Sequence, residues 1–378
     1  MTKALYAFSG DPITYGHIDI VERTAKAFDE VIVGIGKNPD KKYTFSLEER
    51  REMAKRSLQH LSNARVVSFE GLLVDYAYEQ GVQVIVKGVR DSKDFEYEVQ
   101  LHHIGDSQRL GIDTFFLSAR KELTHVSSSS VKSLQKENGL IHQYVPLYVK
   151  QCVEARISEQ YILGVTGEPG MGKSYIGEKV VEEGKQRGIP VHHIELDHIG
   201  HKIYLRQEPV YQNIRENIIN HFGSHLRLPD GSIDRKALGE IVFGNREQLQ
   251  KLNTLMYDPM LVGLRQELRG KRGIILFDAA LLAESELAHL CNNNVLLVTA
   301  NEATQQQRLQ TRILTPEQIQ RRLASQYRTA EKKAALEKKI TEGRNGKLLI
   351  FDNSEGIPAS SISDLFSEVQ EYFGIPKS

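Results

Sequence analysis

The sequence has little cysteine, no tryptophan and no net charge. Only two of its 378 residues are cysteines, Cys152 and Cys291. Two cysteines cannot build the disulfide framework of a small secreted domain, so we expect a reducing, cytoplasmic location. Lys+Arg and Asp+Glu both total 49, and a chain without an overall positive field has no general attraction for nucleic acid. We therefore expect no nucleic-acid partner.

Long apolar runs are also missing. No stretch approaches the length that spans a bilayer, and residues 1–8 lack the charged segment and apolar run of a signal peptide. We therefore expect no membrane partner. The hydrophobic content of 40% and the charged content of 26% are typical of globular proteins. A length of 378 residues leaves room for two or three domains.

A phosphate-binding loop lies near the middle of the chain, where residues 167–174 read GEPGMGKS and match G-x-x-x-x-G-K-S. A strand-like run precedes it at 161–165 and a helical pattern follows at 175–187, as this motif requires; a chance glycine-rich turn would not explain both flanks. Lys173 would reach the β- and γ-phosphates of ATP, and Ser174 would hold Mg²⁺. Because such a loop follows the first strand of its domain, a second domain should start just before residue 161. The residues predicted to bind ATP here are Gly167, Gly170, Met171, Gly172, Lys173, Ser174 and Tyr175.

A carboxylate follows the next predicted strand, which runs over 191–196 and ends at Asp197. In kinases with a phosphate loop, a carboxylate at this place accepts the proton of a substrate hydroxyl; the alternative is that Asp197 only caps the next helix. His192, His193, His198 and His201 lie nearby, but no cysteine or paired carboxylate has ligand spacing with them, so we expect no metal site there.

Arginines follow two further apolar strands, which are predicted at 273–277 and 294–298. Taken alone these arginines indicate a solvated helix face, but beside a phosphate loop they favour a lid that closes over the transferring phosphate. The pattern does not rank them. They are Arg308, Arg312, Arg321, Arg322 and Arg328.

The first half alternates strands with helices, which is typical of a doubly wound parallel sheet. Strands are predicted at 3–8, 31–35, 64–69, 82–86 and 114–117, and helices at 18–28, 46–61, 72–80, 96–110, 131–137 and 143–158. Ser46, followed by Glu49, predicts a capping box. Ligands of such sheets bind beyond the carboxyl ends of the strands, in the loops 9–17, 34–42, 87–90 and 118–129.

Those loops carry residues suited to phosphates. Gly16 and His17 open one helix and the serines 127–130 open another, and helix N-termini attract anions. Lys41, Lys42, Lys87 and Arg90 add positive charge. Each feature has an ordinary alternative as a cap or a solvated surface, but their convergence on one sheet edge favours a phosphate site.

At these residues the chain resembles bacterial phosphopantetheine adenylyltransferase, over residues 3 to about 155. The motifs are D-P-I-T-x-G-H-I-D-I-V, K-K-x-x-F-x-L-E-E-R, K-G-V-R, D-F-E-Y-E and S-S-S-x-V-K. The resemblance implies a Rossmann-like nucleotidyltransferase that transfers AMP from ATP to 4′-phosphopantetheine with Mg²⁺, and a core that forms homo-oligomers. The family's T-F is Ser9-Gly10 here, and its first R of R-G-[LV]-R is Lys87, which keeps the charge but not the planar fork.

The resemblance also implies roles for single residues. His17 and Lys41 would stabilise the transition state. Phosphopantetheine would be bound by Ser9, Lys41, Leu73 and Lys87. ATP would be bound by Ser9, Gly10, His17, Gly88, Val89, Arg90, Glu98, Ser127, Ser128 and Ser129.

The second half resembles dephospho-coenzyme A kinase, over about 160–360. The motifs are V-T-G-x-x-G-x-G-K-S, D-G-S-I-D-R-K-A-L at 230–238, I-V-F at 241–243, A-L-L-A-E at 280–284, and Q-x-x-x-x-E-K from Gln326. The resemblance implies phosphorylation of the ribose 3′-hydroxyl of dephospho-coenzyme A, with Lys173 and Asp197 as catalytic residues and Arg308 and Arg312 on the lid. The family's His-Pro is Asp258-Pro259 here, and its proline before L-L-x-E is Ala280.

The product of the first reaction is the substrate of the second, so the two resemblances support each other. We expect two α/β domains with doubly wound parallel sheets, a nucleotidyltransferase at 1–157 and a phosphate-loop kinase with a helical lid at 158–378, in the domain order of coenzyme A synthase. One alternative is a nicotinamide mononucleotide adenylyltransferase fused to a ribosylnicotinamide kinase, whose family favours I-S-S-T-x-I-R over S-S-S-x-V-K. The other is a non-catalytic nucleotide- or coenzyme-A-binding regulator with one inactive half.

Overall fold

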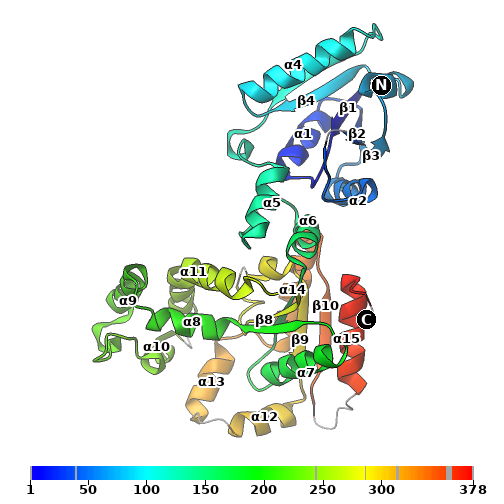
Figure 1. Cartoon of the computed structure of the whole chain (residues 1–378). Coiled ribbons are helices and arrows are strands. Elements are labelled where there is room, and N and C mark those ends of the chain that lie inside the picture. The colour runs from blue at the N-terminus through cyan, green and yellow to red at the C-terminus, as the bar shows by residue number, and fades with distance from the viewer. Residues whose placement is uncertain are drawn as a thin grey trace. The chain divides into compact units, whose positions relative to one another are not determined.

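The computed structural model describes residues 2–38, 41–242, 245–285, 287–311, 315–354 and 360–376. The chain divides into two compact units, Met1–Ser158 and Glu159–Ser378. Each unit contains one five-stranded sheet whose paired strands are all parallel, with helices on its faces (Figure 1). The expected fold class, two parallel α/β sheets, is confirmed. Among the described helices, none is both long and apolar enough to cross a membrane.

The first sheet has the order β3-β2-β1-β4-β5. The chain therefore builds outward from β1 in one direction and then crosses to β4 on the other side, so a switch point lies between β1 and β4. Ligands of open α/β sheets bind at the carboxyl ends of the strands at such a point. The strands are β1 (Lys3–Phe8), β2 (Glu30–Gly36), β3 (Ala64–Phe69), β4 (Val84–Val89) and β5 (Asp113–Ser118).

Alternating residues of these strands enter two separate apolar clusters. Tyr6, Val33 and Val86 pack on one face with α1, α2, α5 and α6, and Leu5 and Ile32 pack on the other with α3. The helices of this unit are α1 (Tyr15–Ala25), α2 (Leu47–Leu58), α3 (Leu73–Glu79), α4 (Ser92–Asp106), α5 (Ser128–Lys136) and α6 (Leu147–Val153), with a 3₁₀ turn at Lys121–Leu123 and a π-helical turn at Glu154–Ser158.

Caps decide several helix boundaries. The capping box of Ser46 and Glu49 is present, as predicted. The start predicted at residue 18 is wrong, because Thr14 is the N-cap and α1 begins at Tyr15. The starts predicted at residues 96 and 143 are also wrong, since Asp91 caps α4 and α6 begins only after Pro146.

The second sheet has the order β10-β9-β6-β8-β7. The edge strand β10 was not among the predicted strands. The strands are β6 (Gln160–Thr166), β7 (Val191–Glu195), β8 (Gly273–Asp278), β9 (Val295–Thr299) and β10 (Leu348–Asp352). The helices are α7 (Lys173–Gln186), α8 (Leu196–Leu205), α9 (Pro209–Phe222), α10 (Arg235–Val242), α11 (Arg246–Leu268), α12 (Glu302–Gln310), α13 (Pro316–Ala324), α14 (Thr329–Gly343) and α15 (Ser360–Phe373), with 3₁₀ turns at Ser224–Leu226 and Ala288–Cys291.

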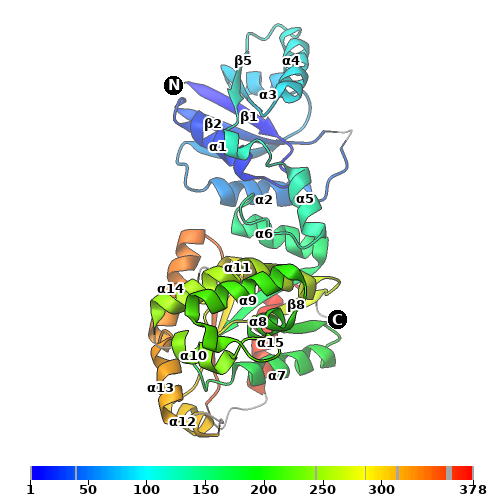
Figure 2. The ribbon, with the colours of Figure 1, turned by 90° about the vertical axis from the view of Figure 1, so that its left-hand side faces the viewer.

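Helices α7 and α15 lie side by side against one face of this sheet (Figures 1 and 2). The buried Ile176, Val180 and Phe366 join them to the strands, and Arg187 at the end of α7 donates hydrogen bonds to Ser363 of α15. Helices α8 to α11 gather into a group of their own beside the sheet (Figure 2). This arrangement leaves the carboxyl edge of β6 to the phosphate loop and the helices that follow.

Candidate active sites

Two helix N-termini meet at the carboxyl edge of the first sheet. Thr14 precedes α1 and Ser127 caps α5, where its side chain accepts from the N–H of Ser130 at 3.0 Å. Ser128 Oγ donates to the carbonyl of Pro12 at 2.7 Å, and a Cβ at Gly16 would lie 3.7 Å from the carbonyl of Val126. The predicted elements 16–17 and 127–129 are therefore brought together, so two helix N-termini, each of which favours an anion, lie at the same edge of the sheet.

His17 is a half-buried histidine whose hydrogen bonds define its tautomer. Its Nδ1 accepts from the backbone N–H of Thr14 at 3.0 Å and lies 2.9 Å from Thr14 Oγ1, so the proton of the neutral ring is on Nε2. The ring stacks on Phe8 with centroids 4.4 Å apart. Burial first, and then the charges of Arg90 and Lys41, lower the pKa of His17 to about 4. At neutral pH the imidazole is uncharged and donates from Nε2.

The cations predicted in the loop 87–90 are paired with carboxylates of α4. Lys87 Nζ lies 2.7 Å from Glu98 Oε2, and Arg90 holds Asp94 through two hydrogen bonds of 2.6 and 3.0 Å. Each cation at the end of β4 is therefore joined to α4 by an ion pair. The strand itself reaches Val89 rather than ending at residue 86.

Gly88 has a packing reason to be glycine. A Cβ at this position would lie 2.9 Å from Ile20 Cγ1 of α1, which is closer than carbon atoms approach. The close contact lets β4 lie directly against α1, whose first turn carries His17. Gly10, at φ 62°, is a second glycine in a conformation that favours it.

Asp11 is a site residue that the sequence analysis missed. Its buried carboxylate accepts from the N–H groups of Thr44 and Phe45, the latter at 2.9 Å, and from Lys132 Nζ at 2.6 Å. Burial raises the pKa of Asp11, but the hydrogen bonds from Lys132 and the two N–H groups lower it below its usual value overall. Asp11 thus ties the loop after β1 to α5 and to the start of α2. The one available signal was Lys132, which ends the S-S-S-x-V-K motif.

Arg50 is the second missed residue. It is 1% exposed and donates to the carbonyls of Ser9 and, at 2.9 Å, Gly36. Its guanidinium lies 3.9 Å from the ring centroid of Tyr43, whose hydroxyl accepts from the N–H of Asn38 at 2.7 Å. Arg50 therefore holds together the bases of two predicted site loops, of which the second carries Lys41.

The remaining predicted residues of this unit are less constrained. Lys41 is exposed, and Leu73 is half-buried at the start of α3, where it packs against the cluster of Leu5 and Ile85. Val89 ends β4 and is half-buried. Figure 1 shows α1 and α5 with the strands that position these residues.

The phosphate loop of the second unit adopts the geometry that its glycines allow. Gly170 and Gly172 have φ of 87° and 85°, and a Cβ at Gly172 would lie 2.3 Å from Asn353 Nδ2. A Cβ at Gly167 would lie 2.3 Å from the carbonyl of Val298. Lys173 begins α7 and its Nζ donates back to the carbonyls of Gly167 at 3.0 Å and Glu168 at 3.3 Å. The lysine therefore lies across its own loop.

Side chains of α12 and of the residue after β10 donate hydrogen bonds to the backbone of the phosphate loop. Asn353 and Arg308 donate to the carbonyl of Met171 at 2.8 and 3.3 Å, and Gln305 donates to the carbonyl of Pro169 at 2.9 Å. Arg308, predicted on the lid, thus contacts the loop backbone; Arg312 lies outside the described residues. Ser174 and Tyr175 are exposed on the first turn of α7.

The carboxylates near this loop differ from the expectation in one respect. The strand predicted to end at Asp197 ends at Glu195, because α8 begins at Leu196. Asp197 therefore lies exposed in the first turn of α8. The N-cap of α8 is Glu195, so Asp197 is not the capping residue of this helix.

Asp278 is a missed carboxylate at the end of β8. It is 7% exposed and paired in register with Val165 of β6, two residues before the phosphate loop. His193 Nε2 lies 3.3 Å from its Oδ2. Burial lowers the pKa of His193, but the bond and charge of Asp278 raise it above the usual value overall. The His193 ring also fills the space where a Cβ of Gly177 would be, so the pair lies under α7.

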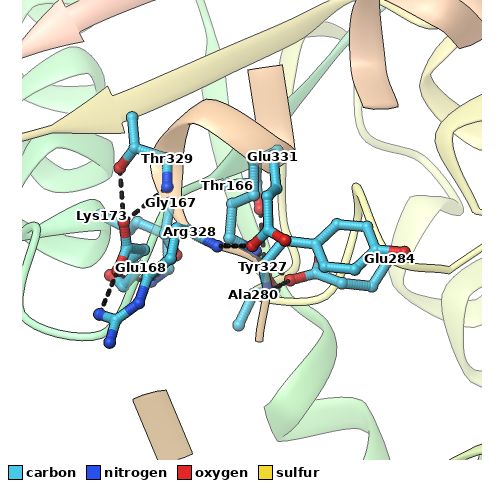
Figure 3. Close-up of polar contacts among 11 residues, drawn as sticks. Thr166, Gly167, Glu168, Lys173, Ala280, Glu284, Tyr327, Arg328, Thr329 and Glu331 are labelled. Carbon is cyan, nitrogen blue, oxygen red and sulfur yellow. Dashed lines mark hydrogen bonds and ion pairs between the residues drawn. The ribbon is translucent and has the colours of Figure 1, made fainter. Parts of the chain in front are cut away.

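A buried ion pair joins two of the quoted motifs near the loop. Lys332 is 0% exposed, and its Nζ donates to Glu284 Oε1 at 2.6 Å and to the carbonyl of Ala280 at 2.8 Å. Thr166, which ends β6, donates to the same carbonyl at 3.2 Å. Figure 3 shows Thr166, Ala280 and Glu284 together with Lys173. The segments 280–284 and 326–332 are therefore one structural unit with the start of the phosphate loop.

Comparison with known proteins matches both units. The family model described as Cytidylyltransferase-like matches residues 9–134, and the one described as Dephospho-CoA kinase matches residues 161–345. The Phosphopantetheine adenylyltransferase of Clostridium novyi is 44% identical over 146 residues, which cover 39% of this chain and 91% of that protein. The protein of the same name from Actinobacillus succinogenes is 40% identical over 156 residues, covering 41% and 97%. The one from Clostridium kluyveri is 46% identical over 146 residues, covering 39% and 89%.

Proposed function

Because the chain belongs to the phosphopantetheine adenylyltransferase family through its first half and carries a dephospho-CoA kinase domain in its second, we propose that residues 1–157 and 158–378 are separate catalytic modules. Together they perform the last two steps of coenzyme A biosynthesis. The first module converts ATP and 4′-phosphopantetheine to dephospho-CoA and pyrophosphate. The second transfers the γ-phosphoryl group of another ATP to the ribose 3′-hydroxyl of dephospho-CoA. We place the protein in the cytoplasm, in accord with its two free cysteines.

In the first module the attacking group is a phosphate oxygen, which is already an anion. It bonds to the α-phosphorus as the bond to the pyrophosphate oxygen breaks, and no base is needed. His17 Nε2–H donates to an α-phosphate oxygen, where charge develops, and Lys41 neutralises the same charge. The two helix N-termini align the phosphates. Ser9, Lys87 and Leu73 hold phosphopantetheine, and Gly10, Gly88, Val89, Arg90, Glu98 and the serines 127–129 hold ATP.

In the second module the nucleophile is a neutral hydroxyl. Asp197 accepts its proton while the 3′-oxygen bonds to the γ-phosphorus and ADP leaves. Lys173 turns from the carbonyls of Gly167 and Glu168 to the β- and γ-phosphates. Residues 167–175 supply the N–H groups that surround the phosphates.

Mg²⁺ fits the donors beside the phosphate loop. Ser174 presents an exposed hydroxyl on the first turn of α7, and the buried carboxylate of Asp278 ends the neighbouring strand. Hydroxyl and carboxylate oxygens are the ligands that a hard divalent cation prefers. We propose that these two residues hold the ion, which neutralises phosphate charge when bound.

The observation that carries the proposal is the neutral, oriented His17 between two helix N-termini, in a chain whose second unit has an intact phosphate loop. The test is to incubate the protein with 4′-phosphopantetheine and MgATP and to resolve dephospho-CoA from coenzyme A by mass spectrometry. We expect both, in that order of appearance. Turnover of nicotinamide mononucleotide instead would indicate the nicotinamide enzyme, and binding without turnover would indicate a regulator.

We also propose that the protein forms a homo-oligomer through α4. This 15-residue helix has no buried residue, and Phe95, Tyr97, Leu101 and Ile104 are 45, 53, 37 and 59% exposed. Apolar side chains gathered in this way on a single helix mark an interface. Light scattering should show an oligomer for the wild type and a smaller species for Ile104→Glu. An unchanged mass for the variant would assign the interface elsewhere.

A further inference from the structure

Glu168 is a carboxylate inside the phosphate loop. It is the second residue of the loop and is only 6% exposed. A loop that receives the anionic phosphates of ATP loses affinity from a fixed negative charge unless that charge is neutralised. The neighbours of Glu168 therefore decide how it affects the site.

Those neighbours are at the start of α14. Glu168 Oε1 accepts from the N–H of Thr329 at 2.6 Å and from its hydroxyl at 2.7 Å, and Oε2 lies 3.2 Å from Arg328 NH1 (Figure 3). Burial raises the pKa of Glu168, but these hydrogen bonds lower it below its usual value overall. The carboxylate is thus ionised and joined to α14.

Arg328 is held firmly at its backbone while its side chain faces solvent. Its N–H donates to Glu331 Oε2 at 2.8 Å, and the N–H of Tyr327 donates to Glu284 Oε1 at 2.7 Å. Its side chain is 59% exposed. Glu168 is the residue that keeps this guanidinium at the phosphate loop.

Arg308, the other described arginine at the loop, has a different environment. It donates to the carbonyl of Met171 and therefore supports the loop backbone. An arginine that meets a transferring phosphate needs unused donors and an anchored base. Arg328 has five N–H donors and gives one of them to Glu168.

We propose that Arg328 contacts the ATP phosphates during phosphoryl transfer, and that Glu168 is a positioning residue that holds Arg328 there. The inference rests on the proposed kinase function. As the bond between the γ-phosphorus and the β–γ bridging oxygen breaks, ADP takes up negative charge, and the guanidinium stabilises that charge without exchanging a proton. The proton of the 3′-hydroxyl goes to Asp197, as above.

A helix cap could by itself explain the contact between Glu168 and Thr329. Two variants separate the possibilities, since Glu168→Gln keeps an acceptor for Thr329 and loses the charge that attracts Arg328, whereas Arg328→Met removes only the guanidinium. We expect Arg328→Met to lower kcat for dephospho-CoA phosphorylation about 10²-fold and Glu168→Gln about tenfold. Adding Glu168→Gln to Arg328→Met should change kcat less than about twofold, because Glu168 acts through Arg328.

Three readouts distinguish this role from a structural one. ATP affinity should fall more than ADP affinity in Arg328→Met, measured by calorimetry. Guanidinium ion should restore part of the activity of Arg328→Ala, and Arg328→Lys should retain more activity than Arg328→Met. The adenylyl-transfer rate of the same protein serves as the control for folding.

Arg272 and Glu159 provide the matched control pair. They form an exposed ion pair of 2.9 Å in the same unit, beside the first residue of β8 and so at the amino edge of the sheet, away from the loop. Arg272→Met should leave both activities unchanged. Equal loss of ATP and ADP affinity, additive effects of the two substitutions, or an unchanged kcat in Arg328→Met would each overturn the proposal. A wild-type protein that does not phosphorylate dephospho-CoA would instead overturn the proposed function.

Discussion

The two units bind the same kind of group, a nucleotide phosphate, with donors prepared in different ways. In the first, His17 is half-buried, neutral and held through Nδ1, so its proton already points in one direction. In the second, Lys173 is bonded to the carbonyls of its own loop and must turn to reach a ligand. A nucleophile that is already an anion needs only alignment, whereas a hydroxyl needs a base and an environment that closes over it.

The ion pairs of the two units differ in a similar way. Asp11 and Lys132 tie loops of the first site to one another, which favours a rigid arrangement. Glu168 and Glu284 tie the phosphate loop and the segment after β8 to α14, the helix that follows α13. The loops of the first site are therefore held together by an ion pair among themselves, and the phosphate loop of the second is tied to α14.

The largest expected effect separates the two units. Lys173→Ala removes the charge that meets the β- and γ-phosphates, and we expect kinase activity to fall about 10³-fold or more. Adenylyl transfer should continue at a near wild-type rate, so dephospho-CoA should accumulate in a product assay by mass spectrometry. Loss of pyrophosphate release in folded Lys173→Ala would mean that the two sites are coupled, and the comparison would fail.

The next largest expected effect concerns His17, the hydrogen-bond donor that is held in a fixed orientation in the first unit. His17→Ala should lower kcat for adenylyl transfer about 10²-fold, the usual loss for one preorganised donor. Its ATP affinity should change little, because Nε2 acts on charge that develops only in the transition state. Steady-state kinetics with both substrates varied provide the measurement. If ATP affinity collapsed while kcat held, His17 would be a ground-state ligand.

Burial of His17 also predicts a dependence of stability on pH. Its pKa is about 4 in the folded protein and about 6.5 when unfolded, so between these values the unfolded chain binds more protons. The stability that His17 contributes is present above pH ~6.5 and is lost as the pH falls toward ~4, by about 3 kcal/mol.

The measurement compares wild type with His17→Gln. Urea unfolding followed by circular dichroism at pH 7 and near pH 4.5 gives the free energy of unfolding of each protein, and all other titrating groups are shared. Wild type should lose more stability than the variant on acidification. Parallel losses in the two proteins would show that the ring is not held neutral.

The smallest expected effect concerns Lys87, which stands where the family's R-G-[LV]-R motif has its first arginine. Lys87 is paired with Glu98 at 2.7 Å, and Lys87→Arg would let one planar group contact both the carboxylate and a substrate phosphate. We expect KM for 4′-phosphopantetheine to fall about tenfold, roughly the effect of one added charged hydrogen bond, with KM for ATP unchanged. A raised KM would show that the lysine suits this site better.

The sequence alone determined the features that depend on neighbouring residues. The phosphate loop was predictable because the positive φ of Gly170 and Gly172 belongs to the local backbone. The capping box of Ser46 and Glu49 was predictable for the same reason, since three residues separate the partners. The alternation of strands and helices similarly indicated both parallel sheets, although the edge strand β10 escaped it.

Only the tertiary structure decided which charges meet. Lys132 and Asp11 are 121 positions apart in the chain, and Arg328 and Glu168 are 160 apart, so no spacing rule connects them. The partial burial of His17 and the contacts of Arg328 and Arg308 with the phosphate loop likewise arise from packing. Hydrogen bonds and ion pairs depend on distances of a few ångströms and on the exclusion of water, and both are set by how the strands order and the helices cover them.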